Sequence, residues 1–159
     1  MCGISGLVDF TKLLSKTEIS SIIKNFNDTL SHRGPDSNGL KIYNNIGLGH
    51  TRLSIIDLSK NGFQPMENDE AKTTISYNGE IYNYLFLRNK YFKNEKFYSN
   101  TDTEVILKLY SKIGIEKLIQ EINGMYAFCI FDQKKNKIFL NKDKIGKKPL
   151  YYYFDKDYI

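Results

Sequence analysis

The sequence predicts an α+β fold in which largely antiparallel sheets are layered with helices in an αββα arrangement. Segments with the two-residue period of strands occur in clusters joined by short turns, and helical segments stand between the clusters. The strict strand–helix alternation that is typical of a parallel sheet is missing. No repeat or linker interrupts the 159 residues, so we expect one domain over residues 1–159.

The first predicted elements are a strand and a helix. Apolar residues alternate with others from Gly3 to Phe10, which is the period of a strand. Ser15 and Glu18 have the spacing of a capping box, which satisfies free backbone N–H groups in the first turn of a helix. Apolar side chains at helical spacing follow, so we expect a helix over residues 16–31. Pro35 cannot continue it, because proline lacks the N–H that the helix needs.

Short strands and turns are expected next. Residues 40–43 and 46–50 are β-like runs, and the asparagine pair between them favours a turn. Residues 52–58 mix apolar and polar side chains without a clear period. Asn61-Gly62 and Gln64-Pro65 then interrupt the pattern with turn signals.

A β-rich run at residues 73–77 leads into Asn78-Gly79. This dipeptide between apolar segments is the strongest short-range signal for a β-hairpin turn. A type I′ turn at this point is therefore the structural explanation of the pair. Beyond it the pattern becomes helical, from Glu80 to about Tyr91.

The last third of the chain is predicted to start with a helix. Thr101 and Glu104 form a second capping box, and Gly114 suits the position just after a helix end. A shorter helix is expected over residues 116–121. The strands expected after it are apolar or aromatic runs at residues 125–131, 137–140 and 150–154.

Composition indicates a globular protein of balanced charge. There are 23 basic and 18 acidic residues, and the one dense basic run, from Lys142 to Lys148, is interpreted as a solvated turn. No aromatic–basic pattern accompanies it, so we expect no nucleic-acid partner. No apolar run is long enough for a membrane span and no signal peptide is evident, so we expect a cytoplasmic protein without a membrane partner. The two cysteines are too few for a disulfide scaffold.

Cys2 stands directly after the initiator methionine. If Met1 is removed, Cys2 carries a thiol and a free α-amine, whose ordinary pKa is about 7.7–8.0. The residue then contains a nucleophile and a base that can activate it. The tripeptide alone is a weak indication of catalysis.

The start of the chain is the first of five motifs that occur together. They are Cys2-Gly3-Ile4, Arg33-Gly34-Pro35-Asp36, the segment Gly49–Ile55, the segment Tyr77–Asn83, and Thr101-Asp102-Thr103-Glu104. In this order and spacing the chain resembles the glutaminase domain of class II (N-terminal nucleophile) glutamine amidotransferases. It resembles most the glutaminase domain of glutamine-hydrolysing asparagine synthetase. The resemblance covers essentially the whole chain and implies the four-layer αββα sandwich of N-terminal-nucleophile hydrolases.

The resemblance implies a role for individual residues. The family's nucleophile corresponds to Cys2, and its oxyanion site corresponds to the Asn78 amide and the Gly79 backbone N–H. Preorganised donors at such a site are worth about 3 kcal/mol each. The substrate clamp corresponds to Arg52 for the α-carboxylate of glutamine and to Asp102 for its ammonium. Further substrate contacts are implied for Glu80 and for the backbone of Leu53, Ser54, Ile55 and Ile56.

Other reactive side chains are interpreted as structural. His50 is not needed as a base if the α-amine of Cys2 serves, and Cys129 lies in an apolar run and is expected to be buried. We expect no metal site. The family's Arg-Asp-Arg-Phe-Gly-Ile-Lys-Pro segment carries Lys142 in place of its first arginine here, so a planar two-pronged contact is lost.

The implied reaction converts L-glutamine and water to L-glutamate and ammonia through a thioester on Cys2. In asparagine synthetases the ammonia reaches a C-terminal domain that uses ATP and magnesium to amidate aspartate, and no such domain is expected within these 159 residues. We expect no cofactor for the glutaminase step. The expected partners are glutamine and a synthetase domain or subunit, and a homodimer is left open. The alternative is a non-catalytic glutamine-sensing or structural module with the same fold.

Overall fold

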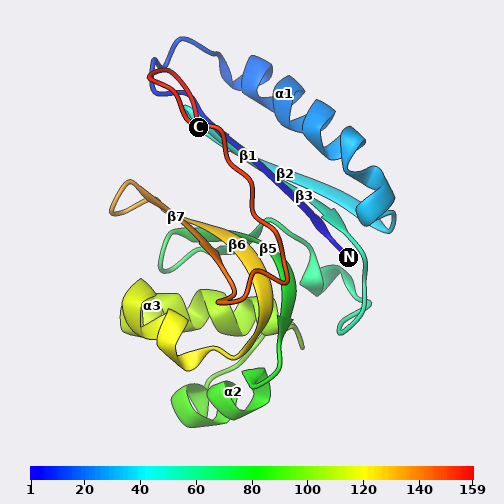
Figure 1. Ribbon diagram of the computed structural model, residues 1–159. Helices are drawn as coiled ribbons and strands as arrows, with labels where there is room; N and C mark the ends of the chain where they lie inside the picture. Colours follow the sequence, from blue (N-terminus) through cyan, green and yellow to red (C-terminus); the bar gives the residue numbers. More distant parts are fainter.

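Two antiparallel sheets lie face to face between two layers of helix in the computed structural model, which describes residues 1–159. Helix α1 (Lys16–Thr29) covers the outer face of one sheet, and helices α2 (Tyr84–Phe92) and α3 (Asp102–Glu121) cover the outer face of the other (Figure 1). The predicted α+β fold with four αββα layers is therefore confirmed.

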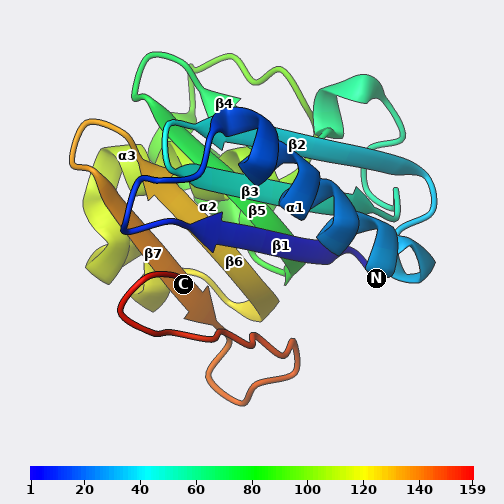
Figure 2. The ribbon, with the colours of Figure 1, turned by 90° about the horizontal axis from the view of Figure 1, so that it is seen from above.

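The first sheet has three strands in the order β1-β3-β2. They are β1 (Gly3–Val8), β3 (Ile46–Arg52) and β2 (Ser37–Tyr43). The central strand β3 is buried along its whole length. Helix α1 lies across this sheet (Figure 2), and a Cβ atom at Gly47 would come within 2.6 Å of the Ile23 side chain. The capping box of Ser15 and Glu18 is present at the start of α1, as predicted.

The second sheet has four strands in the order β4-β5-β6-β7. They are β4 (Met66–Asn68), β5 (Thr73–Ile81), β6 (Gly124–Asp132) and β7 (Lys137–Lys142). The larger hydrophobic core fills the space between this sheet and helices α2 and α3. A smaller cluster, which includes Leu48 and Phe131, joins the inner faces of the two sheets.

Helix α3 is interrupted at Gly114, as the sequence predicts. Thr101 caps its start by accepting a hydrogen bond from the Glu104 backbone N–H. The predicted capping box is only half formed, because the Glu104 carboxylate accepts from the Tyr98 and Ser99 N–H groups instead of the Thr101 N–H. Gly114 has φ +76°, in the left-handed region that glycine adopts without strain, and a second helical segment continues to Glu121. Short 3₁₀ turns at Ser31–Arg33 and Lys60–Gly62 complete the helical structure.

The predicted hairpin turn at Asn78-Gly79 is wrong. Both residues continue strand β5, where Asn78 pairs with Ala127 and Gly79 with Tyr126 of β6. Pairing with a strand distant in the sequence outweighs the local turn preference of the dipeptide. The same pairing delays the following helix, which begins at Tyr84 and not at Glu80.

Two other differences concern short or terminal segments. Residues 150–154 form no strand, and Tyr151, Tyr152, Tyr153 and Phe154 are exposed. A strand needs a partner for its backbone, and this aromatic run has none. Strand β4 has three residues and is too short to show a period in the sequence. None of the helices combines the length and the apolar character that crossing a bilayer requires.

Candidate functional site

A pocket of about 130 Å³ gathers residues that are far apart in the sequence. Cys2 lies just before β1, Arg52 ends β3, Asn78 and Gly79 lie in β5, and Asp102 begins α3. Leu53, Ile55, Ile56 and Glu80 also line the pocket, whereas Ser54 does not. Nine of the ten predicted site residues therefore meet at one cavity.

Hydrogen bonds hold both the backbone and the thiol of Cys2. Its carbonyl oxygen accepts a hydrogen bond from Arg33 Nε at 3.2 Å, and the next N–H, of Gly3, donates to Thr51 Oγ1 at 3.1 Å. The thiol sulfur in turn accepts from the Leu53 backbone N–H at 3.4 Å. Cys2 is half-buried and lines the pocket, and these contacts come from two segments, the turn at Arg33 and the end of β3 with the residues after it.

The Arg33–Asp36 loop supports this arrangement by packing closely on β3. A Cβ atom at Gly34 would lie 2.3 Å from the carbonyl group of Thr51, so only glycine fits there. Asp36 Oδ2 accepts a hydrogen bond from the Ser54 N–H at 2.7 Å. This bond ties the Ser54 backbone to the loop, and Ser54 does not line the cavity.

Asn78 and Gly79 present strand β5 to the pocket. Asn78 is buried, and a Cβ atom at Gly79 would lie 2.3 Å from the Met125 carbonyl oxygen. The neighbouring Tyr77 carbonyl accepts a hydrogen bond from His50 Nε2 at 3.0 Å. Burial lowers the pKa of His50 to about 4, so the ring is neutral and braces β5 against β3. His50 is structural, as the sequence reasoning expects.

Arg52 is buried at the pocket wall, and its guanidinium is already bonded to the following loop. Nη1 donates to the Ser59 carbonyl at 2.9 Å and Nη2 donates to the Asp57 carbonyl. The Asp57 carboxylate accepts a bond from the Asn100 N–H, which contributes most to lowering the pKa of this carboxyl. The guanidinium has five N–H donors, so these bonds leave donors for a ligand.

Asp102 is buried beneath the pocket and anchored to β5. Its Oδ2 accepts hydrogen bonds from the Tyr77 hydroxyl at 2.6 Å and from the Ile81 N–H at 2.9 Å. Burial raises the pKa of Asp102, and burial together with the Asp102 charge raises that of Tyr77. A cation in the pocket would favour the charged form of this carboxylate. Glu80 is exposed at the rim.

Comparison with known proteins decides the family. The family described as "Glutamine amidotransferase domain" matches residues 1–159, which is the whole chain. The chain belongs to this family. The predicted resemblance is therefore confirmed, and with it the prediction that the chain is an enzyme domain.

Similar curated proteins are larger than this glutamine amidotransferase domain. It is 49% identical to a putative asparagine synthetase [glutamine-hydrolyzing] 2 of Methanocaldococcus jannaschii, over 98% of this chain and 32% of that protein. It is 35% identical to asparagine synthetase B of Escherichia coli K12, over 98% of this chain and 27% of that protein. The chain thus spans about a third or less of the length of these relatives.

A solved structure supports the fold. The glutamine phosphoribosylpyrophosphate amidotransferase of Bacillus subtilis superposes with a TM-score of 0.72, over 90% of this chain and 37% of that one. The two sequences are only 18% identical there, so the likeness concerns the fold alone.

The glutamine amidotransferase pocket also contains residues that the sequence reasoning missed. Tyr77 bonds to Asp102, and Gln64 accepts from the Tyr77 N–H at 2.7 Å. Tyr77 is the first residue of the Tyr77–Asn83 motif, and this position is a signal that could have found it. Lys148 belongs to the basic run predicted to be a solvated turn, and this prediction is wrong for Lys148 alone: Lys142, Lys144 and Lys147 are exposed, but Lys148 is buried.

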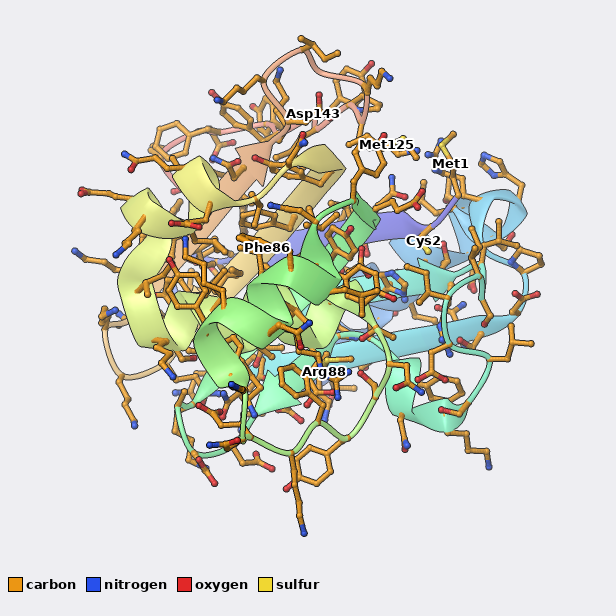
Figure 3. All side chains as sticks on the ribbon, turned by 90° about the horizontal axis from the view of Figure 1, so that it is seen from below. Met1, Cys2, Phe86, Arg88, Met125 and Asp143 are labelled. Atoms are coloured by element: carbon orange, nitrogen blue, oxygen red, sulfur yellow. The ribbon has the colours of Figure 1, made fainter.

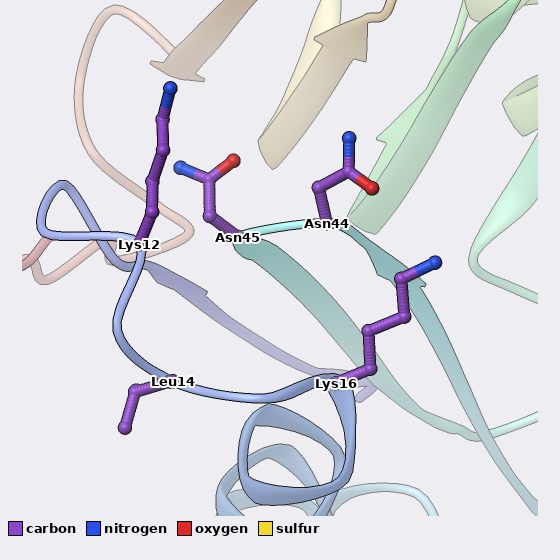
Figure 4. Close-up of a pocket in the computed structure, with 5 residues that line it drawn as sticks. All are labelled: Lys12, Leu14, Lys16, Asn44 and Asn45. Atoms are coloured by element: carbon purple, nitrogen blue, oxygen red, sulfur yellow. The ribbon is translucent and has the colours of Figure 1, made fainter.

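The remaining candidate features lie outside this site. Cys129 is buried between the sheets, and burial raises the pKa of its thiol to about 12, so it is unreactive, as predicted. A second hollow, of about 370 Å³, lies at the far end of the first sheet (Figure 4). Lysine, leucine and asparagine side chains line it, and none of them carries a thiol, a hydroxyl or a carboxylate: Lys12, Leu14, Lys16, Asn44 and Asn45.

Proposed function

We propose that this domain hydrolyses L-glutamine to L-glutamate and ammonia through a γ-glutamyl thioester on Cys2. The observation that supports this most is the meeting of Cys2, Arg52, Asn78, Gly79 and Asp102 around one pocket. They come from the chain terminus, two strands of different sheets and a helix. A nucleophile, two candidate oxyanion donors and groups for both ends of an amino acid are the parts that this reaction needs.

Met1 must be removed before the reaction can start. It precedes Cys2 and lines the same pocket as Cys2 and Met125; the three residues are labelled in Figure 3. Removal frees the α-amine of Cys2 and opens space beside the thiol. The amine then takes the thiol proton, either directly or through a water molecule, and the thiolate attacks the side-chain amide carbon of glutamine.

The attack forms a tetrahedral intermediate whose oxygen carries the negative charge. The Asn78 amide and the Gly79 N–H are the proposed donors to this oxygen. The carbon–nitrogen bond then breaks, and the amine returns its proton to the departing ammonia. A water molecule hydrolyses the thioester, which releases glutamate and restores the thiol.

The clamp that orients glutamine is proposed to use both charges at the pocket wall. The free donors of the Arg52 guanidinium suit the α-carboxylate, since the planar fork matches two carboxylate oxygens. The α-ammonium would lie at Asp102, with Glu80 at the rim and the backbone of Leu53, Ile55 and Ile56 along the side. The ammonium would supply the countercharge that buried Asp102 lacks.

The ammonia is proposed to pass to an asparagine-synthetase-type domain or subunit that amidates aspartate or a related carboxylate. The relatives' names, which describe glutamine-hydrolysing asparagine synthetases, support this role. The glutamine step is proposed to need no cofactor, with ATP and magnesium acting only at the acceptor site. The reaction is proposed to take place in the cytoplasm, where thiols such as that of Cys2 stay reduced.

Trapping the thioester with hydroxylamine tests the proposal. The chain without Met1, incubated with L-glutamine and hydroxylamine, is expected to form γ-glutamyl hydroxamate. Two control chains should form none: Cys2→Ala, and a chain with one alanine inserted before Cys2, which leaves the cysteine without a free amine. Glutamine binding without hydroxamate or glutamate would favour a sensing module, and equal turnover by Cys2→Ala would exclude the proposed nucleophile.

A further inference from the structure

Lys148 is a buried cation in the pocket that the proposed reaction leaves unused. Only 6% of it is exposed, although lysine is among the residues that are seldom buried without a partner. It lines the pocket together with Met1, Cys2 and Met125. Its place in the pocket therefore calls for an explanation from the chemistry of the site.

The main chain of Lys148 is held firmly, and its side chain is directed at residue 1. Asp143, which is buried, accepts a hydrogen bond from the Lys148 N–H at 2.9 Å and another from the Tyr126 N–H at 3.1 Å. The Lys148 ammonium nitrogen lies 2.9 Å from the Met1 sulfur. A thioether is a weak acceptor, so this contact compensates little of the cost of burying a charge.

No carboxylate neutralises this ammonium. Lys148 belongs to none of the five ion pairs of the structure. The other charged groups around the pocket have their own partners or are exposed. Arg33 donates to the Cys2 carbonyl, Arg52 donates to the Ser59 carbonyl, and the Asp57 carboxylate accepts from the Asn100 N–H. Asp102 accepts from the Tyr77 hydroxyl, and Glu80 is exposed at the rim.

Removal of Met1 leaves the Lys148 ammonium next to the new α-amine. The Met1 sulfur is joined to the Cys2 nitrogen through the rest of residue 1, so the two nitrogens lie within roughly 9 Å of each other by standard bond lengths. We propose that Lys148 is an electrostatic positioning residue, whose charge disfavours protonation of the Cys2 α-amine and keeps it in the base form. This inference rests on the proposed function, because that function makes the amine the base.

The size of the effect follows from Coulomb's law. A unit charge at this separation shifts the midpoint of protonation of the amine downward by about 0.3 to 1.4 pH units, between a water-like and a protein-like dielectric. A free α-amine with its ordinary pKa of about 7.7–8.0 is mostly protonated at pH 7, with only about 10–15% in the base form. A downward shift of about 0.3 to 1.4 pH units therefore increases the fraction of chains with an unprotonated amine about two- to eight-fold.

The titration of the α-amine can be measured without glutamine turnover. In a Cys2→Ala chain with Met1 removed, the rate of acetylation of the residue-2 amine by acetic anhydride is followed against pH by peptide mass spectrometry. The same chain is prepared with Lys148→Met and with Lys148→Arg, and circular dichroism checks that each is folded. Lys148→Met should raise the midpoint by about 0.3 to 1.4 pH units, and Lys148→Arg should leave it unchanged.

Equal midpoints in all three chains would overturn the inference, as would an equal rise with methionine and arginine, which would indicate a packing effect. Because the Cys2→Ala chain cannot form the thioester, this result is independent of the proposed glutamine reaction. A failed hydroxylamine trap would contradict that reaction and leave the amine titration unaffected.

Discussion

Acid should loosen the contact between the two sheets through a single side chain, His50. The ring is 1% exposed and Nε2 lies 3.0 Å from the Tyr77 carbonyl oxygen. A carbonyl can only accept, so Nε2 carries the hydrogen and Nδ1 is unprotonated. Nδ1 is buried without a hydrogen-bond partner. A proton added there would place an unpaired charge between the sheets.

The pKa of His50 sets the sign and size of the effect. Burial, with a smaller contribution from the Arg52 charge, lowers it from 6.5 to about 4 against the opposing effect of the Tyr77 bond. The unfolded chain binds the proton near pH 6.5 and the folded chain only near pH 4, so the free energy of unfolding falls as pH drops between these values. At about 1.4 kcal/mol per pH unit, the loss is about 2 kcal/mol by pH 5 and about 3 kcal/mol by pH 4.

Urea unfolding of the wild type and of His50→Gln, between pH 7 and pH 5, measures how much His50 contributes to the pH dependence of the free energy of unfolding. Glutamine can still donate to the Tyr77 carbonyl but does not titrate. The raised pKa of Asp102, due to burial, acts in the opposite direction, and the lowered pKa values of carboxylates such as Asp143 act at lower pH. Both are common to the two chains and cancel in the difference. If the two stability curves run parallel from pH 7 to pH 5, the reasoning is refuted.

Three substitutions test other contacts. Asn78→Ala should reduce glutamine turnover by about 10²–10³-fold with an unchanged fold, because the strand pairs through its backbone; turnover near the wild-type rate would contradict the oxyanion role. Tyr77→Phe should cost about 1–3 kcal/mol in urea unfolding, since Asp102 loses a buried partner, and an unchanged midpoint would refute this. Gly34→Ala should cost about 1–3 kcal/mol through the clash with the Thr51 carbonyl; equal melting temperatures would show that the loop can give way.

The motifs predicted most of the pocket because they lie where elements begin or end. Cys2 precedes a strand, Arg52 ends one and Asp102 starts a helix, so a resemblance at these positions also locates them in the fold. The capping box of Ser15 and Glu18, the Thr101 cap and the break at Gly114 were predictable because they depend on neighbours in the sequence. Local chemistry was sufficient in these cases.

Features that depend on distant partners were not predictable in the same way. Asn78-Gly79 has the composition of a turn, but pairing with Ala127 and Tyr126 keeps it in a strand. The aromatic run at residues 150–154 has the composition of a strand but no partner. Lys148 looks like its exposed neighbours in the sequence, and only the fold brings it to Met1.

Covalent labelling of the chain without Met1 tests the central claim, that Cys2 is the nucleophile of a glutamine site. The chain is exposed to a diazoketone analogue of glutamine, and the intact mass and the modified peptide are determined. We predict one adduct per chain, on Cys2, suppressed by excess L-glutamine and absent from the Cys2→Ala chain. Folded chain that lacks Met1 and acquires no adduct on Cys2 would contradict the account.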